Sequence, residues 1–85
     1  MDTTREEMAA LSVMFYEKYA NEAQLASVSR FSDKKGISEW ALEYVEKCVA
    51  LRFMGGISED EFAPKAYASR AEAAAIIKRI YIKYN

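Results

Sequence analysis

Two short stretches of this chain combine a helix-capping pattern with an arginine. Ser69-Arg70-Ala71-Glu72 and Thr4-Arg5-Glu6-Glu7 each place a hydroxyl residue three positions ahead of a glutamate. This spacing is a capping box, in which each of the two side chains accepts a hydrogen bond from the backbone N–H of the other residue. The pattern predicts two helix starts, with capping roles for Ser69, Glu72, Thr4 and Glu7.

The arginines Arg70 and Arg5 stand where a cation is unfavourable. At the first position of a helix the macrodipole is positive, and a cation there is disfavoured by about 0.3–1 kcal/mol. Free backbone amides at a helix N-terminus, together with a guanidinium, make a receptor for a carboxylate or a phosphate. The alternative is that each arginine pairs with a nearby acid such as Glu6, Glu72 or Asp60. The residues alone leave both interpretations open.

The similarity between the two stretches continues beyond the capping box. A set of residues from the first part of the chain recurs 65 positions later: Arg5, Glu7, Ala9, Tyr16, Lys18 and Tyr19 match Arg70, Glu72, Ala74, Tyr81, Lys83 and Tyr84. A match at a fixed offset is the mark of an internal repeat. We therefore divide the chain into residues 1–27, the second half of one unit, and residues 28–85, a complete unit.

Composition excludes several classes of function. Twelve basic and thirteen acidic residues give a net charge of −1, which removes the electrostatic reason for binding nucleic acid. No apolar run approaches the roughly 18 residues that a membrane span requires. There is no histidine and one cysteine, Cys48, so the sequence predicts no metal site, no cofactor and no thiol protease. The carboxylates of the turn at residues 58–61 are a poor catalytic pair, and we expect no enzyme.

Hydrophobic spacing predicts an all-α chain of three main helices. The first covers residues 4 to about 20, the second begins after Ser38 as its cap, and the third covers residues 69 to about 84. Gly55-Gly56 is expected to end the second helix, because glycine often takes the left-handed position there. The connection to the third helix is longer and partly extended, since a residue before Pro64 avoids the helical region.

Each predicted helix has an apolar face that we expect to be buried. These faces are Met8, Leu11, Phe15 and Tyr19, widened by Val13 and Met14, in the first helix; Trp40, Ala41, Tyr44, Val45, Cys48, Val49 and Phe53 in the second; and Ala73, Ile76, Ile77, Ile80, Tyr81 and Tyr84 in the third. Trp40 has a second interpretation, because tryptophan can also stack on the face of a sugar. Its helical spacing favours the core.

The combined motifs resemble one known family. Phe31-Ser32-Asp33, Trp40-Ala41, Gly56 with Phe62-Ala63-Pro64, and Ser69-Arg70-Ala71-Glu72 are similar in order and spacing to an S-layer homology (SLH) repeat. The first helix resembles the end of a preceding repeat. The resemblance implies an SLH-like helical repeat, of which bacterial surface proteins and extracellular enzymes usually carry three, packed around a pseudo-threefold bundle.

The resemblance also implies a function. SLH repeats bind secondary cell-wall polysaccharide, often bearing pyruvate ketals, so it implies a non-catalytic anchoring module on the bacterial cell surface, from a secreted parent. It makes Arg70 and Arg5 the leading ligand contacts, with Trp40 and Gly56 as secondary candidates. Three departures concern binding: glycines usual in this family are replaced by Arg52 and Asp60, and Arg5 is followed by an acid rather than alanine.

A second hypothesis is a structural role in assembly. Met1 looks like the start of an excised fragment, and one and a half repeats lack the partners that a threefold bundle needs. Apolar surface should then be covered by neighbouring SLH repeats or by further copies of the chain in a homo-oligomer, formed by association or by exchange of the first helix.

Overall fold

Residues 2–19 and 31–84 are described by the structure, a computed structural model of the chain. They form three α-helices, α1 (Arg5–Tyr19), α2 (Glu39–Leu51) and α3 (Arg70–Tyr84), with a short 3₁₀ turn, η1 (Lys34–Gly36), ahead of α2. The described residues contain no strand, only an isolated antiparallel bridge. The all-α prediction, with a long connection between the last two helices, is confirmed. The end of the first predicted helix near residue 20 and the division at residue 27 lie outside the described residues.

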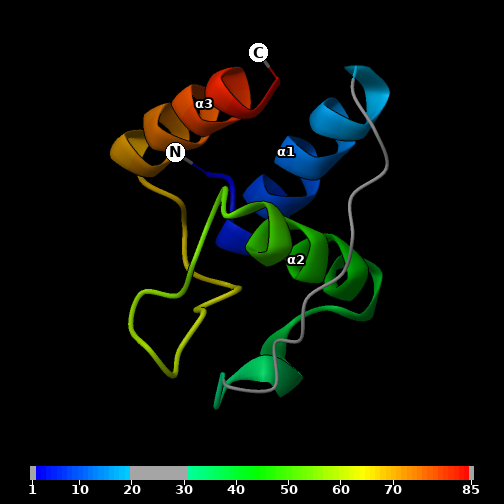
Figure 1. Ribbon diagram of the computed structural model, residues 1–85. Helices are drawn as coiled ribbons and strands as arrows, with labels where there is room; N and C mark the ends of the chain where they lie inside the picture. The colour runs from blue at the N-terminus through cyan, green and yellow to red at the C-terminus, as the bar shows by residue number, and fades with distance from the viewer. Residues whose placement is uncertain (1, 20–30, 85) are drawn as a thin grey trace.

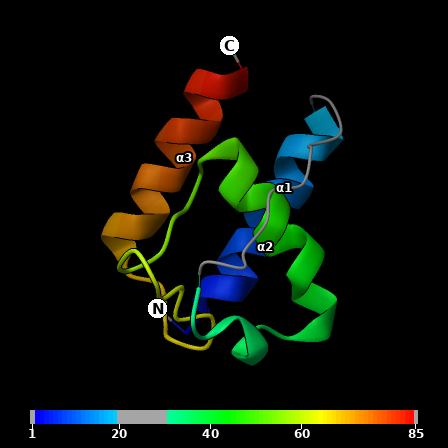
Figure 2. The same ribbon diagram turned by 60° about the horizontal axis from the view of Figure 1, so that its bottom comes forward.

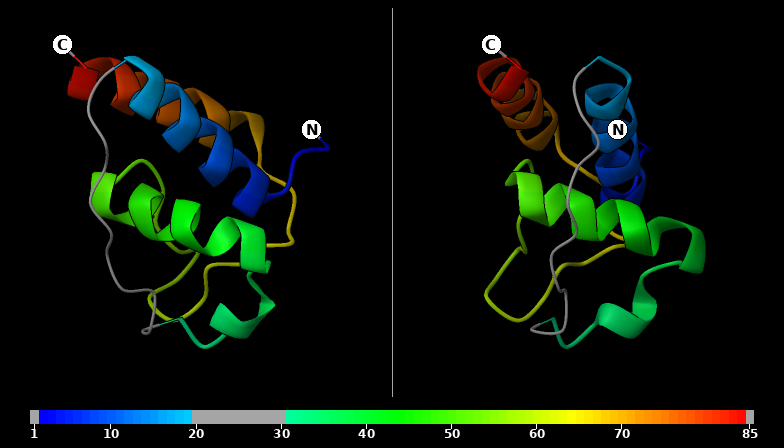
Figure 3. Two further views of the ribbon diagram at one scale, coloured as in Figure 1. Left: turned by 90° about the vertical axis from the view of Figure 1, so that its right-hand side faces the viewer. Right: turned by 45° about the vertical axis from the view of Figure 1, so that its right-hand side comes forward.

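The helix α1 lies at the centre of the arrangement (Figure 1). It packs against α2 and against α3. In Figure 2 and Figure 3, α1 and α3 begin at the same end of the molecule and run in the same direction, while α2 crosses at an angle to them. The helices that follow the two capping boxes are therefore parallel neighbours.

The start of α1 is fixed against the segment that precedes α3. The backbone N–H of Arg5 donates to the carbonyl oxygen of Ala66 at 2.8 Å, and that of Glu6 donates to the carbonyl of Pro64 at 3.0 Å. The bridge between Thr4 and the segment before α3 extends this pairing. Amides in the first turn of a helix have no partner within the helix, so these bonds satisfy groups that would otherwise need water.

Three phenylalanines and one carboxylate hold the loops onto the helices. Phe31, Phe53 and Phe62 are fully buried, and the rings of Phe31 and Phe62 meet edge to face with centroids 5.5 Å apart. The carboxylate of Asp33 accepts the backbone N–H groups of Phe62 at 3.0 Å and Ala63 at 2.7 Å. Residues 31–33 and 62–63 thus form a single packed unit, which explains why they occur together in the motif.

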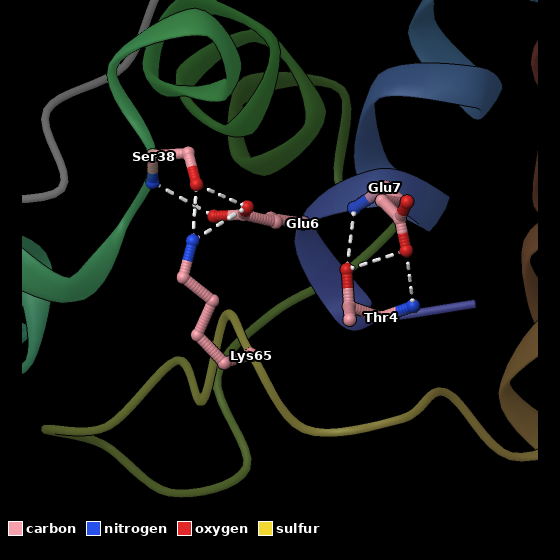
Figure 4. A network of polar contacts seen from close by, with 5 residues as sticks. All are labelled: Thr4, Glu6, Glu7, Ser38 and Lys65. Atoms are coloured by element: carbon pink, nitrogen blue, oxygen red, sulfur yellow. Dashed lines mark hydrogen bonds and ion pairs between the residues drawn. The ribbon is translucent and has the colours of Figure 1, made fainter. Parts of the chain in front are cut away.

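A buried carboxylate, Glu6, joins α1 to the start of α2 (Figure 4). It accepts hydrogen bonds from the backbone N–H and the hydroxyl of Ser38 and pairs with the ammonium of Lys65 at 2.9 Å. Ser38 is the N-cap residue of α2, as predicted, but its hydroxyl bonds Glu6 instead of its own helix. Burial raises the pKa of Glu6, but the hydrogen bonds from Ser38 and Lys65 outweigh it and leave the pKa below its ordinary value.

The predicted buried face of α1 is confirmed at Val13 and is wrong at Leu11, Met14 and Phe15. Leu11 and Phe15 are 57% and 54% exposed, whereas Ala9 and Val13 are fully buried. Since α1 packs against two helices, small residues on its inner face allow close approach, and the larger apolar side chains point away. The side chain of Tyr19 lies outside the described residues.

The faces of α2 and α3 are confirmed only in part. Trp40, expected in the core, is 54% exposed, because α2 packs on α1 through Ala41 and Val45. In α3, Ile76 is buried while Ile77 is 68% exposed. Because α1 is the helix against which α3 packs, half of its broad apolar face remains exposed.

The end of α2 also differs from the prediction. Its last residue is Leu51, and Arg52 takes the left-handed position with φ of 64°. The amides of Arg52 and Phe53 donate to the carbonyls of Val49 and Cys48, each at 3.1 Å. Neither Gly55 nor Gly56 has a positive φ. Glycine is usual at this position in the family because it adopts a positive φ without steric cost. Arginine adopts the same φ only with strain.

Replacing Arg52 by glycine should raise the free energy of unfolding by about 0.5–1 kcal/mol. A side chain in the left-handed region is disfavoured by about 1–2 kcal/mol, and the greater freedom of glycine in the unfolded chain offsets part of the gain. Urea denaturation followed by circular dichroism measures the change. Arg52→Ala is the matched control, because it removes the same charge but keeps a Cβ. An equal gain in Arg52→Ala would mean that charge, and not backbone strain, limits stability here.

Candidate functional site

Both capping boxes form the hydrogen bonds that the pattern predicts. At α1, the Thr4 amide donates to the Glu7 carboxylate at 2.9 Å and the Glu7 amide donates to the Thr4 hydroxyl at 3.3 Å (Figure 4). At α3, the Ser69 amide donates to Glu72 at 2.9 Å and the Glu72 amide donates to the Ser69 hydroxyl at 3.0 Å. The two helices that carry the arginines are therefore started in the same way.

The two arginines behave differently, and Arg5 is held inside the fold. Its side chain is buried, with Nε donating to the carbonyl of Phe62 at 2.8 Å and Nη2 to that of Gly55 at 2.6 Å. Nη1 forms an ion pair with Glu72, and the guanidinium carbon lies 5.1 Å from the centre of the Phe62 ring. Burial lowers the pKa of Arg5 below its ordinary value. For Arg5, the interpretation of an arginine that pairs with a nearby acid is confirmed, and a glycan contact stays a prediction.

The amides at the start of α1 are also engaged. Arg5 and Glu6 donate to backbone carbonyls of the segment before α3, and the Glu7 amide is capped by Thr4. The expectation of free amides beside the arginine is therefore wrong for α1. It failed because the pairing partners lie about 60 residues away along the chain, where local pattern carries no information.

Arg70 lies in the opposite environment. It is the first residue of α3 and is exposed. Within residues 2–19 and 31–84, no hydrogen bond or ion pair engages its side chain, and the amides of Arg70 and Ala71 have no hydrogen-bond acceptor. The geometry expected of an anion receptor is thus present at α3.

A pocket of about 350 Å³ lies between α3, the start of α1 and the loop that follows α2. Its walls consist of Arg5, Met54, Gly55, Gly56, Ala71, Glu72, Ala75, Ile76 and Arg79. Of the residues predicted for the site, the fold brings Arg5, Gly56 and Glu72 together here. Arg70 lies next to the wall residue Ala71 in the chain, while Trp40 is exposed on α2 and is not part of the wall.

Gly56 shapes this pocket because no side chain fits in its place. A Cβ on Gly56 would lie 2.4 Å from the carbonyl oxygen of Ser58, 2.5 Å from that of Glu61 and 2.7 Å from the Phe31 ring. The nearest of these contacts are with backbone, so they cannot be relieved by turning a side chain. Glycine at this position lets the loop fold tightly behind the pocket.

Arg79 is a wall residue that the sequence reasoning missed. Its Nη1 donates to the carbonyl of Phe53 at 2.8 Å, which ties α3 to the end of α2. A signal was present, since Glu72, Ala75 and Arg79 recur at three- and four-residue spacing and must share one face of a helix. Only the first turn of this helix was considered from the sequence as a binding site, and Arg79 lies more than two turns beyond Arg70.

The wall of the pocket combines charged and apolar side chains. It contains two guanidinium groups, one carboxylate and apolar side chains. The thiol of Cys48 is buried in the core, where burial raises its pKa to about 11. No group of three cysteine or acidic side chains that could hold a metal ion occurs in the described parts of the chain. Helices long and apolar enough to cross a bilayer are likewise absent from residues 2–19 and 31–84.

Comparison with known proteins gives one family and several relatives. A family model described as the S-layer homology domain matches residues 30–74. Exoglucanase XynX of Acetivibrio thermocellus is 40% identical over 84 residues, which is 96% of this chain and 8% of the relative. The amylopullulanase of Thermoanaerobacterium thermosulfurigenes is 43% identical over 75 residues, or 87% of this chain and 4% of the relative. The cellulosome-anchoring protein of A. thermocellus is 35% identical over 77 residues, which is 89% of this chain and 17% of the relative.

These relatives differ in name but share this segment. The chain spans no more than 17% of the length of any of these three. No solved structure matches it. What the relatives have in common with this chain is thus a small module within much longer proteins.

Arg5→Met should lower the free energy of unfolding by about 3 kcal/mol. The substitution leaves the carbonyls of Gly55 and Phe62 without donors and Glu72 without its cation. Arg70→Met is the matched control from the equivalent repeat position and should change stability by less than about 0.5 kcal/mol. Urea denaturation of both variants measures the difference. Equal stabilities would show that the contacts of Arg5 do not hold the fold together.

Proposed function

Because this chain belongs to the S-layer homology domain family, we propose that it attaches a longer protein to the bacterial cell surface by binding an anionic, pyruvylated secondary cell-wall polysaccharide. The module itself is non-catalytic. The family and a relative named for anchoring support the attachment role. The choice of an anionic glycan rests on the pocket, which places guanidinium groups beside apolar side chains.

The chemistry of a pyruvate ketal fits this combination. The ketal carries a carboxylate and a methyl group on one carbon, so a receptor needs a cation and an apolar surface within a few ångströms of each other. Met54, Ala75 and Ile76 supply apolar surface in the wall. Arginine supplies hydrogen bonds as well as charge and suits a carboxylate better than lysine.

Arg70 extends the proposed site beyond the pocket. It stands at the start of α3, whose first amides have no acceptor among the described residues, next to the wall residues Ala71 and Glu72. A polymer that places one acid group in the pocket can place a neighbouring residue against this helix start. The two residues that replace usual glycines, Arg52 and Asp60, are not wall residues, which supports a site that retains its shape in this chain.

Purified pyruvylated cell-wall polysaccharide should retain the chain in a pull-down assay, and mild acid removal of the ketals should abolish retention. The physical reason is loss of the carboxylate that faces the guanidinium groups. Arg70→Ala should weaken retention about fivefold or more, in line with the loss of one charge-assisted hydrogen bond.

Equal retention before and after removal of the ketals would disprove recognition of the acid group. If Arg70→Ala binds as well as the parent chain, the helix start is not part of the site. Circular dichroism on the variant confirms that it is folded.

A role in assembly is the second candidate, supported by exposed apolar side chains on both parallel helices. Leu11 and Met14 on α1 are 57% and 44% exposed, and Ile77 and Ile82 on α3 are 68% and 65% exposed. Large apolar side chains gathered on the surface of a small domain often mark an interaction site. Neighbouring repeats or further copies of the chain are the proposed partners.

Sedimentation equilibrium should give an apparent mass above the 9.7 kDa of one chain, rising with concentration. Ile77→Glu should bring the mass back toward a monomer, because a charge on the contact face cannot be buried without a partner. Lys78→Gln, at the next and exposed position of α3, is the control and should leave the association unchanged. A monomer at the highest concentration tested excludes self-assembly through this face.

A further inference from the structure

We infer that Arg79, and not Arg5, is the cation that selects an acid group in the pocket. The inference rests on the proposed function, because it names the residue that would recognise the acid group of the wall polymer. It follows from comparing what each of the two guanidinium groups in the wall already binds.

Arg5 has little left to offer a ligand. The residue is 5% exposed, and each of its three side-chain nitrogens has a protein partner: the carbonyls of Phe62 and Gly55, and the carboxylate of Glu72. A ligand carboxylate that approached Arg5 would have to displace Glu72 or lie beside it, and two carboxylates at one cation repel each other. Arg5 therefore forms part of the pocket's frame.

Arg79 has one hydrogen-bond acceptor, and that acceptor is neutral. Its Nη1 donates to the carbonyl of Phe53, and among the described residues no acid pairs with it. A guanidinium has five N–H donors, so most of its donors remain for a ligand. The residue is exposed, which makes these donors accessible.

The bond to Phe53 also positions the guanidinium. Phe53 is fully buried at the end of α2, and its carbonyl is therefore a fixed point. An arginine tethered to such a point loses less conformational freedom on binding than one free in solvent. Arg79 thus lies against the wall of the pocket as a prearranged donor.

The charge balance of the pocket supports the same assignment. The wall contains two cations, Arg5 and Arg79, and one anion, Glu72. Because Glu72 is paired with Arg5, the unbalanced positive charge belongs to Arg79. An acidic sugar is drawn to that side of the pocket, and a neutral sugar of the same shape gains nothing from it.

The test compares two charge removals at neighbouring positions of α3. Arg79→Gln should weaken retention of pyruvylated wall polysaccharide at least tenfold, and Arg79→Lys should recover part of it, because lysine keeps the charge but not the fork of donors. Lys78→Gln removes the same charge from a residue that is not in the wall, and it should bind within twofold of the parent. Circular dichroism verifies that each variant is folded.

Titration of the parent chain gives a measurement that does not depend on any variant. The methyl glycoside of a 4,6-pyruvylated hexose should shift the side-chain Nε–Hε resonance of Arg79 and leave that of Arg5 in place. A shift confined to Arg5 overturns the inference, as does equal binding by Arg79→Gln and Lys78→Gln. If the parent chain binds neither the polymer nor the glycoside, the proposed function itself fails, which is a different result.

Discussion

The contacts of one side chain, Arg5, hold the described parts of this small fold together. Its guanidinium joins the start of α1 to the loop after α2 through two backbone carbonyls, and to the start of α3 through Glu72. Glu72 uses its other oxygen to cap α3. A chain of 85 residues buries a limited apolar core, so a buried cation shared by three segments fixes positions that packing alone would leave loose. The pocket exists because these segments are held at this spacing.

Two similar capping boxes have different surroundings in this fold. Both capping boxes start a helix that carries an arginine, and the two helices lie parallel. The first arginine meets carbonyls and an acid contributed by residues 55–72, and it becomes part of the interior. The second is exposed, since the described residues contain no further segment of that kind for it to meet. The same motif is therefore part of the interior in one place and exposed in the other.

Two residues of the pocket wall also form the ion pair between α1 and α3, so a substitution at either one changes the pocket and the packing together. Arg5 and Glu72 line the pocket and also stabilise it. Arg79 differs because it closes the pocket with one neutral hydrogen bond and keeps its charge available. The two arginines of the pocket therefore differ in their surroundings, since Arg5 is paired with an acid and Arg79 donates to a neutral carbonyl.

The sequence by itself determined the helices, their capping residues and the family, because these depend on residues close together in the chain. It also predicted ligand contacts at Arg70, Arg5, Trp40 and Gly56, of which Arg5 and Gly56 line the pocket. Tertiary structure alone decided which apolar residues are buried, so that Leu11 and Trp40 are exposed while Ala9 is in the core. It also decided that Arg52 follows the last residue of α2 in a left-handed conformation and that Arg79 lines the pocket. Burial and the lining of the pocket depend on packing between segments that are far apart in the sequence. The local spacing of residues cannot show which side of a helix packs against another segment.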